Sequence, residues 1–270
     1  MPNRSNRSLA AIVIVVCLVI IGVLVLLRFV GRRRASEEAV APPPAPPTTA
    51  VRAPGRVLPL SPGPLPLVSV KPEPVEITFD GCPPEGDNQR QAELNRLKNR
   101  VDEGEYAPIT FDAIAGLTWP QGVERQRREN WAAADVALID RYQGLAVAVE
   151  GYLAGAKQEG TESPNCHGDD ARYRDFHIWL TQNPNEDRSK SIVVEVTPRV
   201  RANHPNWRTD LLGQIVRKDQ RVRISGWLLL DPEHPDQIGK TRATIWEIHP
   251  IMQIEVQQQG QWIPLDKIGG

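Results

Sequence analysis

The sequence predicts a mainly β domain, a five-stranded barrel with one helix between its third and fourth strands. A short helical segment and an N-terminal transmembrane helix precede the barrel. Two observations support this prediction. Beyond Gly144 the spacing of apolar residues changes from the helical period of about 3.6 to the strand period of 2. Five such stretches follow, and one helical stretch separates the third from the fourth.

The chain begins with a predicted membrane anchor, residues 1–31 including its basic flanks. Residues 9–27 carry no charge and are dominated by Leu, Ile and Val. At about 1.5 Å per residue, such a run spans most of the ~30 Å hydrocarbon core of a bilayer. The run is longer than the apolar part of a signal peptide, and arginines follow it instead of a small-residue cleavage site. We therefore expect residues 9–30 to cross the membrane once, as a single-pass anchor.

Residues 32–78 are expected to form a disordered, proline-rich linker. Twelve of residues 42–74 are proline, which favours extended polyproline II and removes amide donors. We interpret the segment as a spacer rather than as a ligand for a proline-binding partner. The arginines after the anchor favour a cytoplasmic domain, whereas the linker and two loop cysteines favour the periplasm. We predict the periplasmic side, in a bacterial cell envelope.

Residues 79–143 are predicted to be a helical extension. The stretch QAELNRLKNRV, residues 91–101, places Leu94, Leu97 and Val101 at helical spacing. In ENWAAADVALIDRYQG, residues 129–144, Asn130 can cap a second helix and Gly144 can end it. The expected buried face of that helix consists of Trp131, Ala134, Leu138 and Tyr142.

Residues 144–270 hold the predicted barrel. Its strands are LAVAVEGYLAGAK, DFHIWLT, SIVVEVTP, RVRISGWLLLD and RATIWEIHPIMQIEVQ, the last bent at Pro250. The helix is expected within residues 204–220, HPNWRTDLLGQIVRKDQ.

This order of elements, with Gly151 and Gly155 in a first strand that must bend, resembles the OB-fold, a five-stranded Greek-key barrel. The resemblance covers residues 144–260. A small β-sandwich is the rival arrangement, and the single helix favours the barrel. The resemblance implies that the outer face of the second and third strands binds oligonucleotides, oligosaccharides or protein partners.

Alternation along these two strands identifies candidate binding residues. Phe176, Ile178 and Leu180 point to one side of the second strand, which we assign to the barrel interior. The outer face then carries Asp175, His177 and Trp179, joined by Glu195 of the third strand. An imidazole, two carboxylates and an indole can orient a polar ligand. Arg199 and Arg201, just beyond the third strand, belong to a basic group that can bind an anion.

Cys82 and Cys166 lie in loops that are rich in Pro and Gly. In an oxidising compartment they can form a disulfide, and in the cytoplasm they would remain thiols. Asp175 and His177 could reach one ion, but paired Cys or His motifs are missing, so we predict no metal and no cofactor. Neither Ser163 nor Cys166 lies in a nucleophile motif, and we predict no catalytic residues.

A second group of acidic and imidazole side chains has the residue types of a catalytic site, but its sequence context favours a structural role. Glu247, Asp231 and Glu233 could combine with His249 or His234. However, the segment Asp231–Pro235 has the composition of a turn, and His249 fits a structural, hydrogen-bonded role in a bent strand.

Net charge narrows the choice of partner. Residues 75–270 contain 23 Lys and Arg and 30 Asp and Glu, a net charge of −7, which disfavours polyanions such as nucleic acid. The sequence therefore predicts a membrane-anchored binding or scaffold module that engages a protein or a glycan. A membrane-tethered nucleic-acid binder and a metal-assisted hydrolase are the alternatives.

Overall fold

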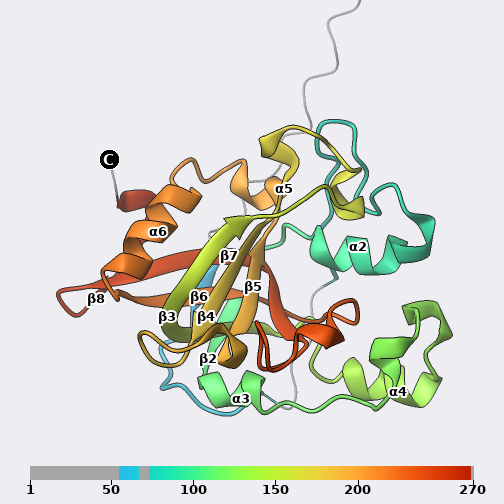
Figure 1. The fold of residues 1–270 in the computed structure, drawn as a ribbon, viewed down its shortest axis with the longest axis horizontal. Helices are drawn as coiled ribbons and strands as arrows, with labels where there is room; N and C mark the ends of the chain where they lie inside the picture. The colour runs from blue at the N-terminus through green and yellow to red at the C-terminus, as the bar shows by residue number, and fades with distance from the viewer. Residues whose placement is uncertain (1–54, 67–72, 269–270) are drawn as a thin grey trace, which may run out of the picture. The chain divides into compact units, whose positions relative to one another are not determined.

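Figure 1 shows the computed structural model, which describes residues 55–66 and 73–268. These residues belong to one compact unit built around a closed five-stranded mixed barrel. The strands pair in the order β3–β4–β5–β7–β6, and β6 pairs with β3 to close the barrel; β5 and β7 are parallel, and the other neighbours are antiparallel. They are β3 (Ala146–Gln158), β4 (Phe176–Thr181), β5 (Ile192–Val196), β6 (Arg221–Leu230) and β7 (Trp246–Gln258). This barrel is consistent with the predicted OB-like barrel.

The barrel interior is apolar, as alternation along the strands predicts. Ile178 and Leu180 of β4 and Val194 of β5 have no exposed surface. They belong to one hydrophobic cluster with Ile224 of β6 and Ile254 of β7. Because every barrel strand contributes to this cluster, its burial stabilises the closed arrangement.

Strand β3 changes partner along its length. Its first half pairs with β6 and its second half with β4, with a register shift between Leu153 and Gly155. At Gly151 the backbone of β4 comes so close that an added Cβ would lie 2.4 Å from the carbonyl oxygen of Thr181. Glycine therefore permits the close approach at which β3 passes from one partner to the next.

Replacing Gly151 by alanine is expected to lower the free energy of unfolding by about 1–3 kcal/mol, the usual cost of overpacking. The added methyl group meets backbone, which cannot move aside without disturbing the pairing of β3 with β4. Urea unfolding followed by tryptophan fluorescence measures the loss. At Gly160 an added Cβ has no neighbour within 4 Å, so Gly160→Ala is the matched control. An equal loss in both variants would contradict the steric explanation.

Two helices, and not one, connect β5 to β6. They are α5 (Pro198–Arg201) and α6 (Thr209–Arg217), where the sequence predicts a single helix within residues 204–220. His204 Nδ1 lies 2.6 Å from an Asp266 carboxylate oxygen, and its ring stacks on Trp207. These contacts hold the turn between the two helices. Leu211, Leu212 and Ile215 form the buried face of α6, which packs against β3.

The remaining elements surround the barrel. The segment before β3 contains β1 (Arg56–Val57), α2 (Ala92–Lys98), β2 (Glu105–Ile109), α3 (Phe111–Ala115) and α4 (Ala133–Ile139), and β8 (Gln261–Pro264) pairs with β7. Single 3-10 turns lie at Gln89–Gln91, Val123–Arg125, Arg128–Asn130, Ser163–Asn165, Ala171–Tyr173, Arg188–Lys190, Pro235–Gln237 and Leu265–Lys267. Helices α2 and α6 lie on opposite sides of the barrel (Figure 1).

Part of the predicted linker packs against the domain. Strand β1 pairs in parallel with β2, and β2 pairs in parallel with β3. Leu65 is buried in the core, and the backbone N–H of Gly55 donates to Glu103. Residues 55–66 therefore differ from the disordered state that their proline content predicts, because β2 offers an edge with which they can pair.

Helix α4 is shorter than predicted, and the face assigned to it is wrong. The helix begins at Ala133 with Ala132 as the N-cap residue instead of Asn130. Trp131 lies before the helix in an extended conformation, where its indole N–H donates to the carbonyl of Val123 at 3.0 Å. This anchor fixes the rotation of the helix, so that Ile139 is buried and Leu138 is 44% exposed.

The predicted anchor over residues 9–30 and most of the predicted linker lie outside the described residues. Within the described ranges, every helix is too short or too polar to cross a membrane.

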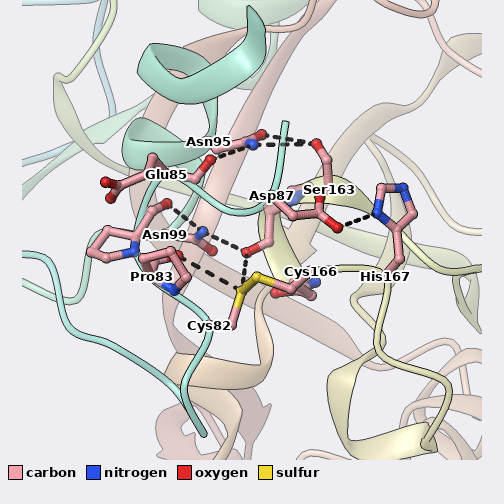
Figure 2. Close-up of a disulfide and its surroundings, with 12 residues drawn as sticks. Cys82, Pro83, Glu85, Asp87, Asn95, Asn99, Ser163, Cys166 and His167 are labelled. Atoms are coloured by element: carbon pink, nitrogen blue, oxygen red, sulfur yellow. Dashed lines mark hydrogen bonds and ion pairs between the residues drawn. A yellow bond between two sulfur atoms is a disulfide. The ribbon is translucent and has the colours of Figure 1, made fainter. Parts of the chain in front are cut away.

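A disulfide joins the segment before α2 to the loop between β3 and β4. It connects Cys82 to Cys166, which are separated by 84 positions in the sequence (Figure 2). Around it, the Asn99 amide donates to the carbonyls of Pro84 and Pro164, and the Asn95 amide donates to the carbonyl of Glu85. The start of the chain's helical segment is thus fastened to the loop that precedes β4.

Candidate functional site

A polar pocket of about 450 Å³ lies over the outer face of β4 and β5. Helix α2 and the turn before it form one wall, and the β3–β4 loop forms another. The β6–β7 loop supplies the rest. The side chains that line the pocket are mostly charged or hydrogen-bonding: Asn88, Gln91, Lys98, Lys157, Glu159, Glu162, His167, His177, Trp179, Glu195, Asp231, Glu233, His234, Gln237 and Arg242.

The predicted outer-face residues lie together here, but they are not solvated. His177, Trp179 and Glu195 line the pocket, and none of them is more than 7% exposed. Asp175 is fully buried behind the pocket wall. The sequence identifies their shared face through alternation, whereas it does not reveal that α2 and two loops cover that face.

His177 joins the two carboxylates on this face. Its Nδ1 lies 2.8 Å from Glu195 Oε1 and 3.1 Å from Glu159 Oε1. Burial disfavours the charged imidazolium, but the hydrogen bonds to Glu159 and Glu195 outweigh burial and raise the pKa of His177 to about 9. Burial likewise opposes the charge on Glu195, and the hydrogen bond from His177 still holds the pKa of Glu195 well below its usual range. The group is therefore a charged cluster at neutral pH.

Trp179 forms an aromatic wall beside His177. The two rings lie 4.6 Å apart, and the guanidinium of Arg188 lies 4.0 Å from the indole centroid. A cation over an indole face is a favourable arrangement. The Trp179 side chain is thus fixed in place and presents little of its surface to a ligand.

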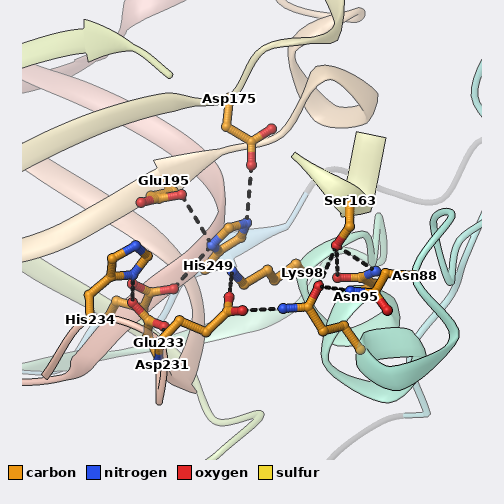
Figure 3. Close-up of polar contacts among 12 residues, drawn as sticks. Asn88, Asn95, Lys98, Ser163, Asp175, Glu195, Asp231, Glu233, His234 and His249 are labelled. Atoms are coloured by element: carbon orange, nitrogen blue, oxygen red, sulfur yellow. Dashed lines mark hydrogen bonds and ion pairs between the residues drawn. The ribbon is translucent and has the colours of Figure 1, made fainter. Parts of the chain in front are cut away.

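A second imidazole, His249 on β7, lies behind the pocket among three carboxylates. Its Nδ1 is 3.1 Å from Glu247 Oε1 and 3.5 Å from Glu195 Oε2, and its Nε2 is 3.7 Å from Asp175 Oδ2 (Figure 3). Asp175, Glu195 and His249 each offer one ligand atom, and these atoms lie within 4.8 Å of one another. From the sequence, Asp175 and His177 are the pair that could bind one metal ion. In the structure, Asp175 lies beside His249 instead.

Burial also changes the proton affinity of the acids in this region. It raises the pKa of Asp175 to about 6, against the opposing effect of His249. It raises the pKa of Glu162 to about 8, and the nearby charges of Asp175 and Glu195 act in the same direction. Strongly shifted groups beside a pocket mark a candidate functional site.

The wall opposite β4 is a salt-bridge network. Arg242 Nη1 lies 2.9 Å from Asp231 Oδ2, and His234 Nδ1 lies 2.7 Å from the same oxygen. Lys98 of α2 reaches across to Glu233 at 3.3 Å (Figure 3). Despite burial, the hydrogen bond from His234 and the charge of Lys98 hold the pKa of Asp231 far below its usual range. The segment interpreted as a plain turn therefore forms part of the pocket.

Arg199 and Arg201, predicted to bind a ligand, lie outside the pocket. The five N–H groups of the Arg199 guanidinium are shared among six acceptors: the carbonyls of Ile77, Cys82, Pro83 and Pro164 and the side chains of Asn99 and Asn165. Burial lowers the pKa of Arg199 to about 10, which leaves it charged at neutral pH. Arg201 donates to the carbonyls of Ala171 and Arg172 and lies over the Phe176 ring. Both arginines fasten loops to the barrel.

Two other polar residues of the β3–β4 loop have structural partners. His167 Nδ1 lies 2.7 Å from Asp87 Oδ2 at the surface. Ser163 donates to Gln91 at 2.7 Å, and the amide of Asn95 donates to Ser163. Ser163 has no histidine base beside it in the part of the chain that the structure describes, so the arrangement does not resemble a nucleophilic site.

Several buried polar residues in and behind the pocket wall have a pattern in the sequence that indicates their position. Glu247 and His249 are two positions apart in an otherwise apolar strand, so they share a face. On α2, Asn95, Lys98 and Asn99 follow helical spacing, and they form a buried polar face beside Leu94. A polar stripe at either period indicates a face that packs against other polar groups.

We compared the chain with protein-family models, with curated proteins and with solved structures, and none of them matches it.

Proposed function

We propose that this protein is a binding module whose ligand occupies the pocket over β4 and β5. The position of the pocket carries the proposal. It combines the outer face of the second and third barrel strands with the loops after the first and fourth strands. Those are the surfaces through which OB-folds bind their ligands, and OB-fold membership is itself part of this proposal.

The enclosure of the site favours a small ligand over a protein surface. A stable protein–protein interface needs about 800 Å² from each partner, whereas the residues of β4 and β5 that would supply it are nearly buried. A pocket of about 450 Å³ falls within the range of small-molecule sites. We therefore choose the glycan over the protein partner, with one sugar unit in the pocket.

The mixed lining favours a ligand that both donates and accepts hydrogen bonds. Glu159 and Glu233 can accept from hydroxyl groups, and Lys157 and Gln237 can donate to ring or hydroxyl oxygens. A polyhydroxylated sugar meets both requirements. A nucleic-acid backbone would meet the carboxylates as like charges, which disfavours the oligonucleotide alternative.

In this proposal the apolar run and the linker tether the module to a membrane, with the domain in the periplasm. The Cys82–Cys166 disulfide supports that side, because disulfides persist in oxidising compartments. The module would then hold a glycan of the cell envelope near the membrane.

Calorimetric titration of the full-length chain with neutral and uronic-acid-containing oligosaccharides tests this function. We expect saturable binding to at least one of them, and Glu159→Gln should weaken that binding about tenfold or more. The expectation rests on the loss of one charge-assisted hydrogen bond, about 1.5–3 kcal/mol.

Glu150→Gln is the matched control. Like Glu159, Glu150 pairs with a basic side chain, Arg221 at 2.7 Å, but it lies on β3 outside the pocket. If no oligosaccharide binds, or if both variants lose affinity equally, the glycan proposal fails. Salt-dependent binding of a single-stranded oligonucleotide in its place would support the nucleic-acid alternative.

A further inference from the structure

His249 is held in the orientation that metal-binding histidines adopt. Its Nδ1 lies 3.1 Å from Glu247 Oε1, and a carboxylate on one ring nitrogen leaves the other free to face an ion. That other nitrogen, Nε2, has no hydrogen-bond partner among the described residues. The residue is 1% exposed, so the nitrogen is not satisfied by bulk solvent.

Asp175 presents a matching oxygen to the same point. Its Oδ1 accepts a hydrogen bond from the Asn165 amide at 2.7 Å, which orients the carboxylate. Its Oδ2 is buried, has no hydrogen-bond partner within the described ranges and lies 3.7 Å from His249 Nε2. Two fully buried polar atoms thus face each other at a distance too long for a hydrogen bond.

Glu195 completes a set of three. One of its oxygens is bound to His177, and the other lies 3.5 Å from His249 Nδ1, on the Glu247 side of the ring. The three candidate ligand atoms lie within 4.8 Å of one another. Around a tetrahedral ion with bonds of about 2.0–2.2 Å, neighbouring ligand atoms lie roughly 3.4 Å apart. Binding of an ion at Nε2 would therefore draw the Glu195 carboxylate from the Nδ1 side of the ring toward Asp175 and Nε2.

We propose that Asp175, Glu195 and His249 bind one divalent transition-metal ion of the Zn²⁺ class behind the floor of the pocket. One imidazole nitrogen and two carboxylate oxygens suit Zn²⁺ or Mn²⁺ better than Ca²⁺, which prefers six to eight oxygens. The charge also fits, because three carboxylates surround His249 in the interior. The ion would leave a fourth position for water.

The proposed ion would act on the pocket through Glu195. This side chain faces His249 with one oxygen and His177 with the other, so the ion would fix the carboxylate that orients His177. The inference does not depend on the glycan proposal, because its readouts contain no sugar.

Zinc titration of the full-length chain tests the inference. The chain is stripped with a chelator and dialysed against excess Zn²⁺. Bound metal is then counted by elemental analysis. All samples carry Cys17→Ser, so that this thiol outside the described residues adds no ligand. We expect one Zn²⁺ per chain, a higher thermal midpoint with zinc than with chelator, and d–d absorption bands when Co²⁺ replaces Zn²⁺.

Asp175→Asn and His249→Gln should each weaken zinc binding at least about 100-fold, more than the loss of an outer-shell partner does. Asp175→Asn is isosteric and keeps an oxygen for Asn165, so it tests the ligand with little disturbance of the fold. His204→Gln is the matched control, because His204 also pairs with a carboxylate, Asp266, away from the site. It should retain one Zn²⁺ per chain.

Two results would overturn the inference. One is a stripped wild-type chain that takes up less than one Zn²⁺ and shows no change in thermal midpoint. The other is unchanged zinc affinity in Asp175→Asn. Should His249→Gln fail to fold, the zinc-dependent midpoint of the wild type and of Asp175→Asn still decides the question.

Discussion

Replacing Arg199 by methionine is expected to lower the free energy of unfolding by about 3–5 kcal/mol, because several buried oxygens lose a charged donor and each such loss costs about 1–3 kcal/mol. Methionine fills a similar volume but donates nothing to the six acceptors that Arg199 serves. Those carbonyl and amide oxygens come from the segment before α2, from Asn99 at the end of α2 and from the β3–β4 loop. The carbonyls of Cys82, Pro83 and Pro164 keep one other donor each. The buried side-chain oxygens of Asn99 and Asn165 lose the Arg199 donor, which is the expensive outcome.

Tryptophan fluorescence during urea unfolding measures this loss, because all seven tryptophans lie within residues 119–262. The free energy of unfolding of Arg199→Lys should lie between those of the wild type and Arg199→Met, since an ammonium group keeps the charge but has fewer donors in a different geometry. Arg208→Met is the control, because Arg208 is exposed and pairs with Asp210 beside it. It should unfold like the wild type. Equal stability of Arg199→Met and the wild type would show that the network contributes little.

Reducing the Cys82–Cys166 disulfide is expected to lower the free energy of unfolding by about 4 kcal/mol. The bond closes a loop of 84 positions, and in the chain-entropy account a loop of that length restricts the unfolded state strongly. The folded state should retain its barrel, because the barrel core does not include either cysteine. The measurement is a pair of urea transitions, with and without reductant.

The double variant Cys82→Ser/Cys166→Ser separates the bond from the chemistry of the reductant. Its stability should match that of the reduced wild type and should not change when reductant is added. If reduction leaves the wild-type transition unmoved, the disulfide does not stabilise the domain.

The barrel could be predicted because its signal is local. Alternation in DFHIWLT and SIVVEVT identifies Ile178, Leu180 and Val194 as interior, and these residues are fully buried. The same period places His177 and Glu195 on one outer face, where they pair. A period of 2 depends only on residues that are close in the sequence, so it can be recognised without knowing the tertiary structure.

What covers that outer face could not be predicted, because it depends on pairings between distant segments. Lys98 pairs with Glu233, which is far from it in the sequence. Only the folded barrel brings these two residues together. The packing of residues 55–66 on β2 likewise depends on a distant segment. Their proline content predicts a disordered spacer, but the free edge of β2 gives them a strand with which to pair. For Arg199, a basic residue near a strand end predicts a surface, whereas its partners come from three separate segments.

The fastening of α2 has a consequence for how the pocket exchanges its contents. The segment before the helix is linked to the β3–β4 loop by the disulfide, and Asn95 and Asn99 bind that loop from the helix itself. A wall attached in this way cannot swing aside as a hinged lid does. In the binding proposal, a ligand must therefore enter without displacing α2, so this fixed wall limits the cross-section of the molecules that the pocket admits.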